Sequence, residues 1–313
     1  MKSLLLITFV FALRVFAEPV SVGEAGEIKD NLHVPVVLSG VPVESGHVLQ
    51  KYSVFLNRYS PSGEYKGSCT GVIVARDMVL TSAHCLGREV GKVIMHFGVG
   101  GAAGWTHKIT SDRFKHHATY QFRARTGSYW DANGKLIYDP QYYQEFQQSA
   151  STRTEWALYP FTDEYKNMAY DIGVIAVPGG IPAGYIPVEL YRGQFNFKES
   201  VWVAGYGLNS RKREENNVTQ LRALAEQLIG YVRDSSGPNW GFQTYAPGGK
   251  GMCFGDSGGG TFYYDQIARK YFLLGINAMV YNNCSNSHFI MLPHRHTDWI
   301  NSNSEALRRT LSL

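Results

Sequence analysis

The spacing of the apolar runs limits this chain's fold more than any other feature of its sequence. Between residues 53 and 292, short runs rich in β-branched and aromatic residues alternate with glycine, asparagine and aspartate. Many short strands without long helices between them favour an all-β sandwich or barrel over a parallel α/β sheet. The strands expected on this pattern are residues 53–56, 69–75, 78–82, 92–99, 171–177, 201–206, 227–232, 261–264, 271–280 and 288–292.

A stretch rich in proline and glycine, residues 178–184, lies near the middle of the chain and indicates a connection between two halves. With 313 residues, of which 44% are hydrophobic, the chain can form two domains with cores of their own. We therefore expect a first β domain over residues 37–177 and a second over residues 178–313. One helix is expected to close the second domain, with Arg308 and Arg309 in its last turns, where the helix dipole favours cations.

The N-terminus has the pattern of a secretory signal. Met1-Lys2 precedes an apolar run over residues 4–13, and Val15-Phe16-Ala17 resembles a cleavage site. The run has about half of the ~20 apolar residues that a membrane-spanning helix needs, and no later segment is longer. The sequence predicts a signal peptide over residues 1–17, no membrane span, and a secreted or periplasmic protein.

The charge and the cysteine count exclude two other classes. The formal net charge is +4, from 30 basic and 26 acidic residues, which is too mild to indicate a nucleic-acid partner. Four cysteines are too few to staple a fold of this length, so the core must supply most of the stability. Export would nevertheless allow those cysteines to form disulfides.

Three local segments contain the residue types needed for nucleophilic catalysis. They are Leu-Thr-Ser-Ala-His-Cys ending at Cys85, Tyr-Asp-Ile-Gly-Val-Ile beginning at Tyr170, and Gly-Asp-Ser-Gly-Gly beginning at Gly255. A serine hydroxyl is a weak nucleophile until an imidazole takes its proton and a buried carboxylate orients that imidazole. The glycines beside Ser257 allow a sharp turn that presents the hydroxyl and aims backbone N–H groups at a reacting carbonyl.

In this chain order the three segments resemble those of the trypsin/chymotrypsin-like serine proteases. The resemblance runs from about residue 36 to the end of the chain and implies two antiparallel β-barrels with the active site between them. It implies His84 as general base and acid, Asp171 as the orienting carboxylate and Ser257 as the nucleophile. The N–H groups of Gly255 and Ser257 would form the oxyanion hole, and the reaction would need no metal or organic cofactor.

The separation of His84 from Asp171 is much longer than is usual in the family. Residues 101–170 also hold 15 of the chain's 42 Phe, Trp and Tyr residues, a density that argues against a disordered loop. We interpret residues of about 121–168 as an aromatic-rich insertion in the first barrel.

The resemblance also implies two disulfides, Cys69 with Cys85 near the base and Cys253 with Cys284 at the substrate pocket. Other bridges usual in animal members are absent, so the pattern is closer to bacterial members. Gly251 would lie at the base of the pocket, with Met252, Val280 and His288 in its walls. Because Gly251 carries no carboxylate, the pattern favours an apolar or uncharged side chain before the cleaved bond, although His288 could favour an acidic one.

Activation is predicted from the same resemblance. A segment starting at Val37 resembles the mature start of these proteases, whose new α-amino group pairs with the residue corresponding to Asp256. Residues 18–36 would then be a propeptide. Because Pro35-Val36 is not a basic cleavage site, either a different activating protease cuts there or the site is organised without cleavage.

The leading interpretation is a secreted serine endopeptidase acting on protein or peptide substrates through an acyl-enzyme intermediate. One alternative is an inactive homologue that serves as a binding module. Another is an α/β-hydrolase esterase with Asp265 and His288 or His294 as partners of Ser257, which few helices and a short chain after the serine disfavour. Zinc is not expected, because the pairs His116-His117 and His294/His296 lack a companion ligand at convincing spacing.

Overall fold

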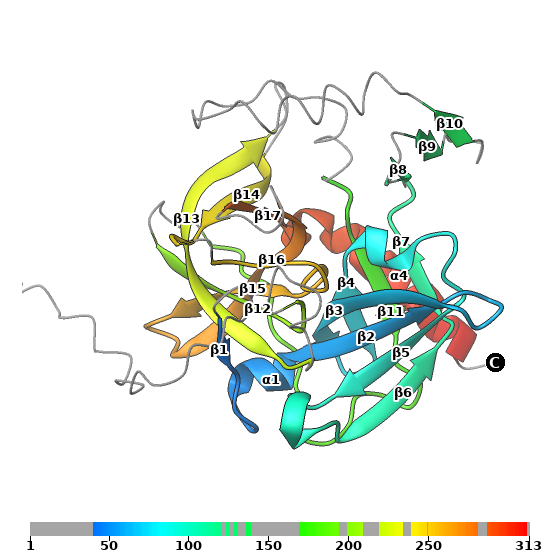
Figure 1. Ribbon diagram of the computed structural model, residues 1–313, viewed down its shortest axis with the longest axis horizontal. Coiled ribbons are helices and arrows are strands. Elements are labelled where there is room, and N and C mark those ends of the chain that lie inside the picture. The colour runs from blue at the N-terminus through cyan, green and yellow to red at the C-terminus, as the bar shows by residue number, and fades with distance from the viewer. Residues whose placement is uncertain are drawn as a thin grey trace, which may run out of the picture. The chain divides into compact units, whose positions relative to one another are not determined.

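The computed structural model describes residues 40–120, 123–124, 128–130, 136–138, 169–193, 199–208, 219–233, 239–248, 250–280 and 287–311 (Figure 1). The predicted signal peptide and propeptide lie outside these residues. Within them, no helix is long and apolar enough to cross a membrane.

The first sheet is antiparallel and has the strand order β6-β5-β2-β3-β4-β11-β7. Its strands are β2 (Ser53–Tyr59), β3 (Tyr65–Ala75), β4 (Met78–Thr81), β5 (Lys92–Phe97), β6 (His107–Ser111), β7 (Phe114–His116) and β11 (Gly173–Ala176). The helix α1 (Val48–Tyr52) leads directly into β2. In the described part of this sheet the edge strands β6 and β7 do not pair, so it curls as a half-barrel.

The second sheet is also antiparallel and has the order β1-β13-β12-β15-β16-β17-β14. An additional pairing between β13 and β14 closes the last six of these strands into a barrel. The strands are β1 (Val41–Pro42), β12 (Ser200–Gly205), β13 (Arg222–Arg233), β14 (Asn239–Tyr245), β15 (Gly260–Asp265), β16 (Lys270–Val280) and β17 (Ser287–Met291). The predicted all-β, two-barrel fold is therefore confirmed.

Two strands differ from the expectation in a way that affects the site. The pattern predicts a strand from residue 227, but β13 begins at Arg222, because β1 and β12 both pair with its first residues. The short strand β1 joins the second sheet, although its residues come before the first sheet in the sequence.

The predicted insertion lies between β7 and β11. Its described residues form a small antiparallel sheet of β8 (Arg123–Ala124), β9 (Ser128–Trp130) and β10 (Leu136–Tyr138). Residues 139–168 of the predicted insertion lie outside the described structure.

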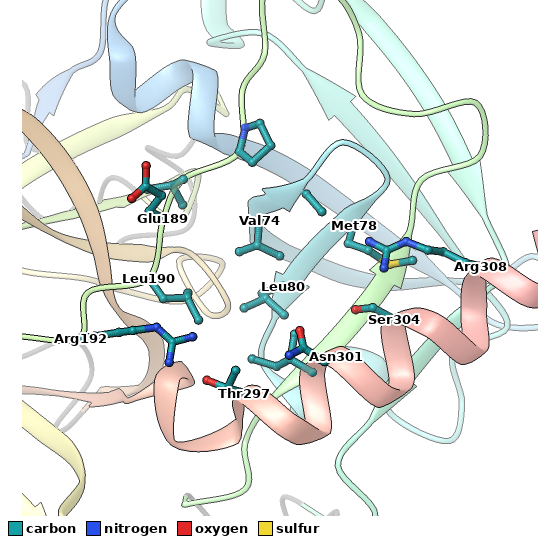
Figure 2. A pocket seen from close by; sticks show the side chains of 14 residues that line it. Val74, Met78, Leu80, Glu189, Leu190, Arg192, Thr297, Asn301, Ser304 and Arg308 are labelled. Carbon is teal, nitrogen blue, oxygen red and sulfur yellow. The ribbon is translucent and has the colours of Figure 1, made fainter.

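The predicted closing helix is present as α4 (Thr297–Leu311), which follows the short 3-10 turn η4 (Pro293–His296). Arg308 binds Asp77 in the β3–β4 turn with two hydrogen bonds of 2.6 and 2.8 Å, so the last turn of α4 is attached to the first sheet. A cavity of about 470 Å³ lies between α4, the β3–β4 hairpin and residues 187–192 (Figure 2). None of the predicted site residues lines it.

The core connects the two sheets. One cluster of buried side chains takes members from the first sheet, such as Leu80 and Val174, from the second sheet, such as Phe262 and Ile276, and from α4. Further clusters fill the interior of each sheet separately. Because the shared cluster joins β4 and β11 to β15 and β16, the ends of these four strands are held beside one another.

Candidate active site

The strand register brings His84 and Asp171 together. β4 and β11 are antiparallel neighbours, with Thr81 opposite Gly173. His84 lies three residues beyond Thr81, in the 3-10 turn η1 (Ala83–Leu86), and Asp171 lies two residues before Gly173. The two side chains therefore lie at the same edge of the first sheet, although the aromatic-rich insertion separates them in the sequence.

Asp171 holds His84 at two points. Its Oδ1 accepts the backbone N–H of His84 at 2.9 Å, and its Oδ2 lies 2.8 Å from His84 Nδ1. A carboxylate can only accept, so Nδ1 donates and Nε2 is left as the proton acceptor. Asp171 is 2% exposed, whereas the His84 side chain is 32% exposed. The pair thus orients an imidazole whose free nitrogen is the basic one.

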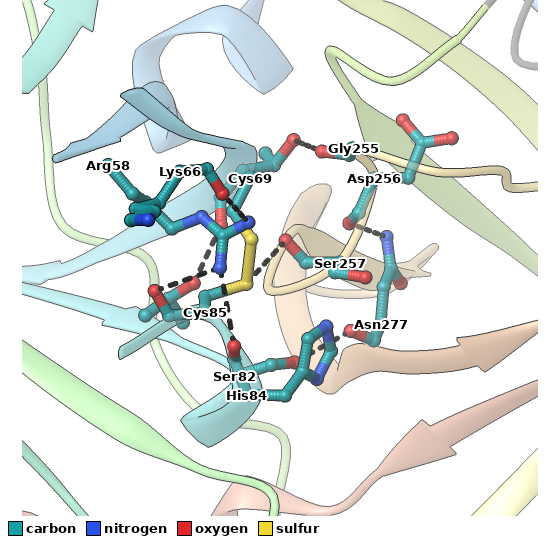
Figure 3. Close-up of a disulfide and its surroundings, with 12 residues drawn as sticks. Arg58, Lys66, Cys69, Ser82, His84, Cys85, Gly255, Asp256, Ser257 and Asn277 are labelled. Carbon is teal, nitrogen blue, oxygen red and sulfur yellow. Dashed lines mark hydrogen bonds between the residues drawn. A yellow bond between two sulfur atoms is a disulfide. The ribbon is translucent and has the colours of Figure 1, made fainter. Parts of the chain in front are cut away.

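A disulfide links η1 to β3. Cys69 on β3 is bonded to Cys85, the residue after His84, and both are buried (Figure 3). The Arg58 guanidinium donates to the carbonyl oxygens of His84 and Cys85, at 3.4 and 3.5 Å. The backbone around His84 is therefore fixed by a covalent bond and by hydrogen bonds.

The segment containing Ser257 bends at two glycines in the left-handed region. Gly255 has φ = 99° and Gly258 has φ = 81°, conformations that glycine adopts at little cost. A Cβ atom at Gly258 would lie 2.0 Å from Thr81 Oγ1. The serine loop thus docks on the end of β4, three residues from His84, and only glycine permits that approach.

Hydrogen bonds from β3 hold this loop against the first sheet. Thr70 donates its backbone N–H to Ser257 O at 2.9 Å, and its hydroxyl to Gly255 O at 2.9 Å. Cys85 Sγ lies 3.7 Å from the same Ser257 oxygen. Ser257 is therefore in contact with the residue that follows His84 (Figure 3).

Asn277 joins the loop to the second sheet. This fully buried side chain donates to Asp256 O and to Ala204 O, each at 3.3 Å, and accepts the Thr261 hydroxyl at 2.8 Å. Its backbone carbonyl accepts both Gly258 N–H, at 2.8 Å, and the Ser82 hydroxyl, at 2.9 Å. One asparagine thus contacts the segments on both sides of the site.

Asp256, the residue before Ser257 in the loop, is fully buried. Its Oδ1 accepts Gly207 N–H and its Oδ2 accepts Cys253 N–H, each at 2.7 Å. A Cβ atom at Gly205 would lie 2.2 Å from Asp256 Oδ1, and one at Gly207 would lie 2.5 Å from its Cγ. The carboxylate thus occupies the space that side chains at positions 205 and 207 would fill.

The groups predicted to form an oxyanion hole are available. Within the described residues, neither Gly255 N–H nor Ser257 N–H donates a hydrogen bond. The same residues contain no hydrogen bond between Ser257 Oγ and His84 Nε2. A catalytic contact of this kind is often long in a free enzyme and tightens when substrate binds.

The predicted pocket residues lie in the second barrel. Gly251 is buried with φ = 137°, and Met252, which is 1% exposed, packs in the core cluster of that barrel. Val280 packs partly against the same cluster and lies opposite His288 in the β16–β17 pair. The side chain of His288 lies outside the described structure. Cys253 is disulfide-bonded, and its predicted partner Cys284 is likewise outside the described residues.

Two of the four histidines considered for zinc, His117 and His296, lie in an aromatic cluster with Tyr170, the residue before Asp171. The His117 ring lies 4.7 Å from Tyr170, 5.3 Å from His296 and 5.2 Å from Trp299, measured between ring centroids. Burial, assisted by the nearby His296 and His116, lowers the pKa of His117 to about 4. Among the described residues, the only three-residue grouping with metal-ligand spacing is Cys69, His84 and Cys85, and its two sulfurs are joined in the disulfide.

A two-barrel β fold that brings a serine loop against a carboxylate-bound histidine defines the class of chymotrypsin-like serine hydrolases. The trypsin family matches residues 37–128 and 141–300, and the chain belongs to that family. Among solved structures, HL collagenase is similar in fold, with a TM-score of 0.55 and 17% identity, over 85% of this chain and 97% of the collagenase chain. No curated protein sequence matches the chain significantly.

Sequence reasoning missed the supporting residues of the site. Gly205 and Gly207 form a Gly-Tyr-Gly triplet at the end of a predicted strand, and this triplet was the available signal for a close backbone approach. Thr70 and Asn277 have no comparable local signal, because their partners are distant in the chain. Phe254, which is 53% exposed three residues before Ser257, was also missed.

Proposed function

We propose that this protein is a secreted serine endopeptidase that hydrolyses peptide bonds through an acyl-enzyme intermediate. The observation that carries the proposal is the two-point bond from the buried Asp171 to His84, at a site where the loop of Ser257 docks. Membership of the trypsin family supports the same reaction class. The serine and histidine that inactive homologues commonly lose are both present, which disfavours a pure binding module.

The proposed mechanism follows from the hydrogen bonds. Ser257 Oγ attacks the substrate carbonyl carbon while His84 Nε2 takes the hydroxyl proton. Asp171 keeps the proton of Nδ1 in place and stabilises the imidazolium that forms. The N–H groups of Gly255 and Ser257 stabilise the oxyanion, each contributing about 3 to 4 kcal/mol in the transition state.

Two further steps complete the reaction. His84 returns its proton to the leaving amine, which releases the first product and leaves an ester on Ser257. A water molecule, deprotonated by His84, attacks that ester. The bond between the acyl carbon and Ser257 Oγ then breaks, His84 returns the proton to Ser257 Oγ, and the second product leaves as a carboxylic acid. No metal or cofactor takes part in these steps.

We propose that the pocket of Gly251, Met252, Val280 and His288 accepts an apolar or uncharged side chain. The absence of a carboxylate at Gly251 removes the charge partner that an arginine or lysine would need. The natural partners would be protein or peptide substrates. A cleavage profile dominated by arginine and lysine would contradict this part of the proposal.

We further propose that residues 1–17 are a signal peptide, that residues 18–36 are a propeptide, and that the two barrels span residues 37–177 and 178–313. Pairing of β1 with β13 supports a start near Val37, because it brings Pro42, five residues after Val37, opposite Arg222, whose charge interacts with that of Asp256. An activating protease other than a trypsin would then cut before Val37. N-terminal sequencing of active protein tests this proposal, and active material that begins at Glu18 would contradict it.

The decisive experiment compares the wild type with Ser257→Ala on a peptide library and with a fluorophosphonate probe. Loss of the nucleophile should lower kcat about a million-fold and abolish labelling. The exposed Ser62→Ala variant, in the β2–β3 turn, is the matched control and should label like the wild type. A wild type that neither labels nor cleaves any peptide would favour the binding-module alternative.

A further inference from the structure

Arg222, the first residue of β13, is a buried cation for which the family resemblance offered no role. It is 5% exposed, and its Nη2 donates to Gln220 Oε1 at 3.3 Å. Its Nε and Nη1 are buried and have no hydrogen-bond partner among the described residues. An arginine so placed loses its hydration, and a nearby negative charge must compensate for that loss.

The register of the second barrel shows which charge this is. Arg222 lies directly opposite Gly205 in the β12–β13 pair. Residues opposite one another on antiparallel strands project their side chains from the same face of the sheet. The face of Gly205 is the one that holds the Asp256 carboxylate, since a Cβ atom there would lie 2.2 Å from Asp256 Oδ1. The Arg222 side chain therefore leaves the sheet on the side of Asp256.

The charges of the two groups are complementary. Both oxygens of the fully buried Asp256 accept backbone N–H groups, which is the pattern of an ionised carboxylate. Burial lowers the pKa of Arg222 to about 10, and the negative charge of Asp256 opposes that shift. The guanidinium is therefore charged at neutral pH and interacts with the carboxylate.

Asp256 connects this charge to the proposed catalytic groups. It lies between Gly255 and Ser257, and its carboxylate binds Cys253 N–H and Gly207 N–H. Without a counter-charge, the carboxylate would favour water, and the loop would have to unbend to bring it there. The conformation of Gly255 and Ser257 thus depends on the charge environment of Asp256.

We propose that Arg222 is a positioning residue that supplies an internal counter-charge for Asp256 and so holds residues 253–258 in their bent conformation. Because Arg222 is an internal residue of the sequence, and not a new chain end made by cleavage, this counter-charge is present before any N-terminal cleavage. This role deepens the proposed function, on which the activity test below rests. It would order the serine loop in a chain that has no basic cleavage site before Val37.

The test is amide hydrogen exchange of residues 252–259 in the full chain, carried out in a Ser257→Ala background to prevent self-cleavage. Arg222→Met should raise the exchange rate in this segment at least about tenfold, because a buried unpaired charge is left behind. Arg222→Lys retains the charge, so its exchange rate in this segment should stay closer to that of the parent. Exchange in β2 and β5 is the internal reference, and Arg308→Met, which breaks the pair with Asp77, is the matched control.

A double-mutant cycle makes the role of Asp256 explicit. If Arg222 acts through Asp256, then Arg222→Met introduced into Asp256→Asn should change the exchange of residues 252–259 by less than about twofold. The double variant lacks both charges, so its comparison with Asp256→Asn remains informative if Arg222→Met alone fails to fold. An equal effect of Arg222→Met with and without Asp256 would overturn the proposal.

Activity provides a separate readout with Ser257 restored. Arg222→Met should lower kcat about a hundredfold, the scale of a lost oxyanion donor, and change KM much less. Unchanged exchange together with unchanged kcat would overturn the inference. A wild type without any peptidase activity would overturn the proposed function alone, because the exchange measurement still decides whether Arg222 positions the loop.

Discussion

The two sides of the candidate active site are held by different kinds of interaction. The side of His84 consists of paired strands of one sheet, a disulfide at the next residue and a carboxylate bound at two points. The side of Ser257 is a loop without strand pairing, held by Thr70, Asn277 and Asp256. The proposed base is therefore built into a sheet, whereas the proposed nucleophile depends on a few buried polar contacts.

This difference predicts how each side of the site responds to substitutions. Strand pairing and a disulfide persist as long as the first sheet is folded. A buried polar network keeps its conformation only while every group in it is satisfied, because the loss of one partner leaves another unpaired in a low dielectric. Changes on the base side should therefore affect either the chemistry or the global stability, while changes on the nucleophile side should affect the local conformation of the loop.

The largest effect in this comparison is expected from Asp171→Asn. An amide in place of the carboxylate would favour the wrong tautomer of His84, so kcat should fall about ten-thousand-fold while the fold is retained. Steady-state kinetics with a matched thermal melt would measure both quantities. The exposed Asp112→Asn variant is the control. A decrease smaller than tenfold would show that Asp171 does not orient the base.

Removal of the disulfide by Cys69→Ala together with Cys85→Ala should have a smaller and global effect. The bridge closes a loop with a sequence separation of 16 residues, and its loss should lower the free energy of unfolding by about 3 kcal/mol. Denaturant unfolding would measure this change. At temperatures where the variant is folded, kcat should stay within about tenfold of the wild type. A loss of activity without a loss of stability would contradict the assigned supporting role.

The smallest effect is expected on the pH dependence of stability, through His117 in the aromatic cluster beside Tyr170. Burial lowers the pKa of His117 from 6.5 to about 4 in the folded protein. Above pH 6.5 both the folded and the unfolded chain carry a neutral imidazole. Between pH 6.5 and about 4 the unfolded chain binds the proton first, so the folded state loses stability as the pH falls.

Because the His117 ring is partly exposed, this loss should not exceed about 1 kcal/mol. Thermal melts at several pH values would measure it, and His117→Phe, which retains the aromatic contacts but cannot titrate, should reduce the dependence on pH. Equal slopes for the variant and the wild type would assign the dependence to other groups, such as His116 or His296, whose pKa values are also lowered by burial.

The sequence predicted the closing helix and ten strands that each have a counterpart in the structure, but in the first and second sheets it missed β1, β6, β7 and β14. It also marked His84, Asp171 and Ser257, whose catalytic roles stay a prediction. These features have local signatures, since strands show in the alternation of apolar runs and turns, and the three residues are marked by their neighbours. The start of β13 at Arg222 and the membership of β1 in the second sheet had no such signature. Both result from pairing between segments that are far apart in the chain.

The residues that support the loop could not be predicted for the same reason. Gly207 binds a carboxylate 49 residues away, Thr70 binds a carbonyl 185 residues away, and Ser82 binds a carbonyl 195 residues away. Threonine, serine and asparagine occur throughout the chain, so their types alone do not indicate which of them are buried or what they bind.

The sequence by itself determined the class of fold and the residues available for the chemistry, because short-range patterns of side-chain polarity and glycine decide which segments become strands and turns. The tertiary structure alone decided that Asp171 meets His84 at two points, that Thr70 and Asn277 hold the loop of Ser257, and that Arg222 lies opposite Gly205, against which Asp256 packs. The physical reason is that these contacts depend on strand register and on burial, and both are set by the packing of the whole core.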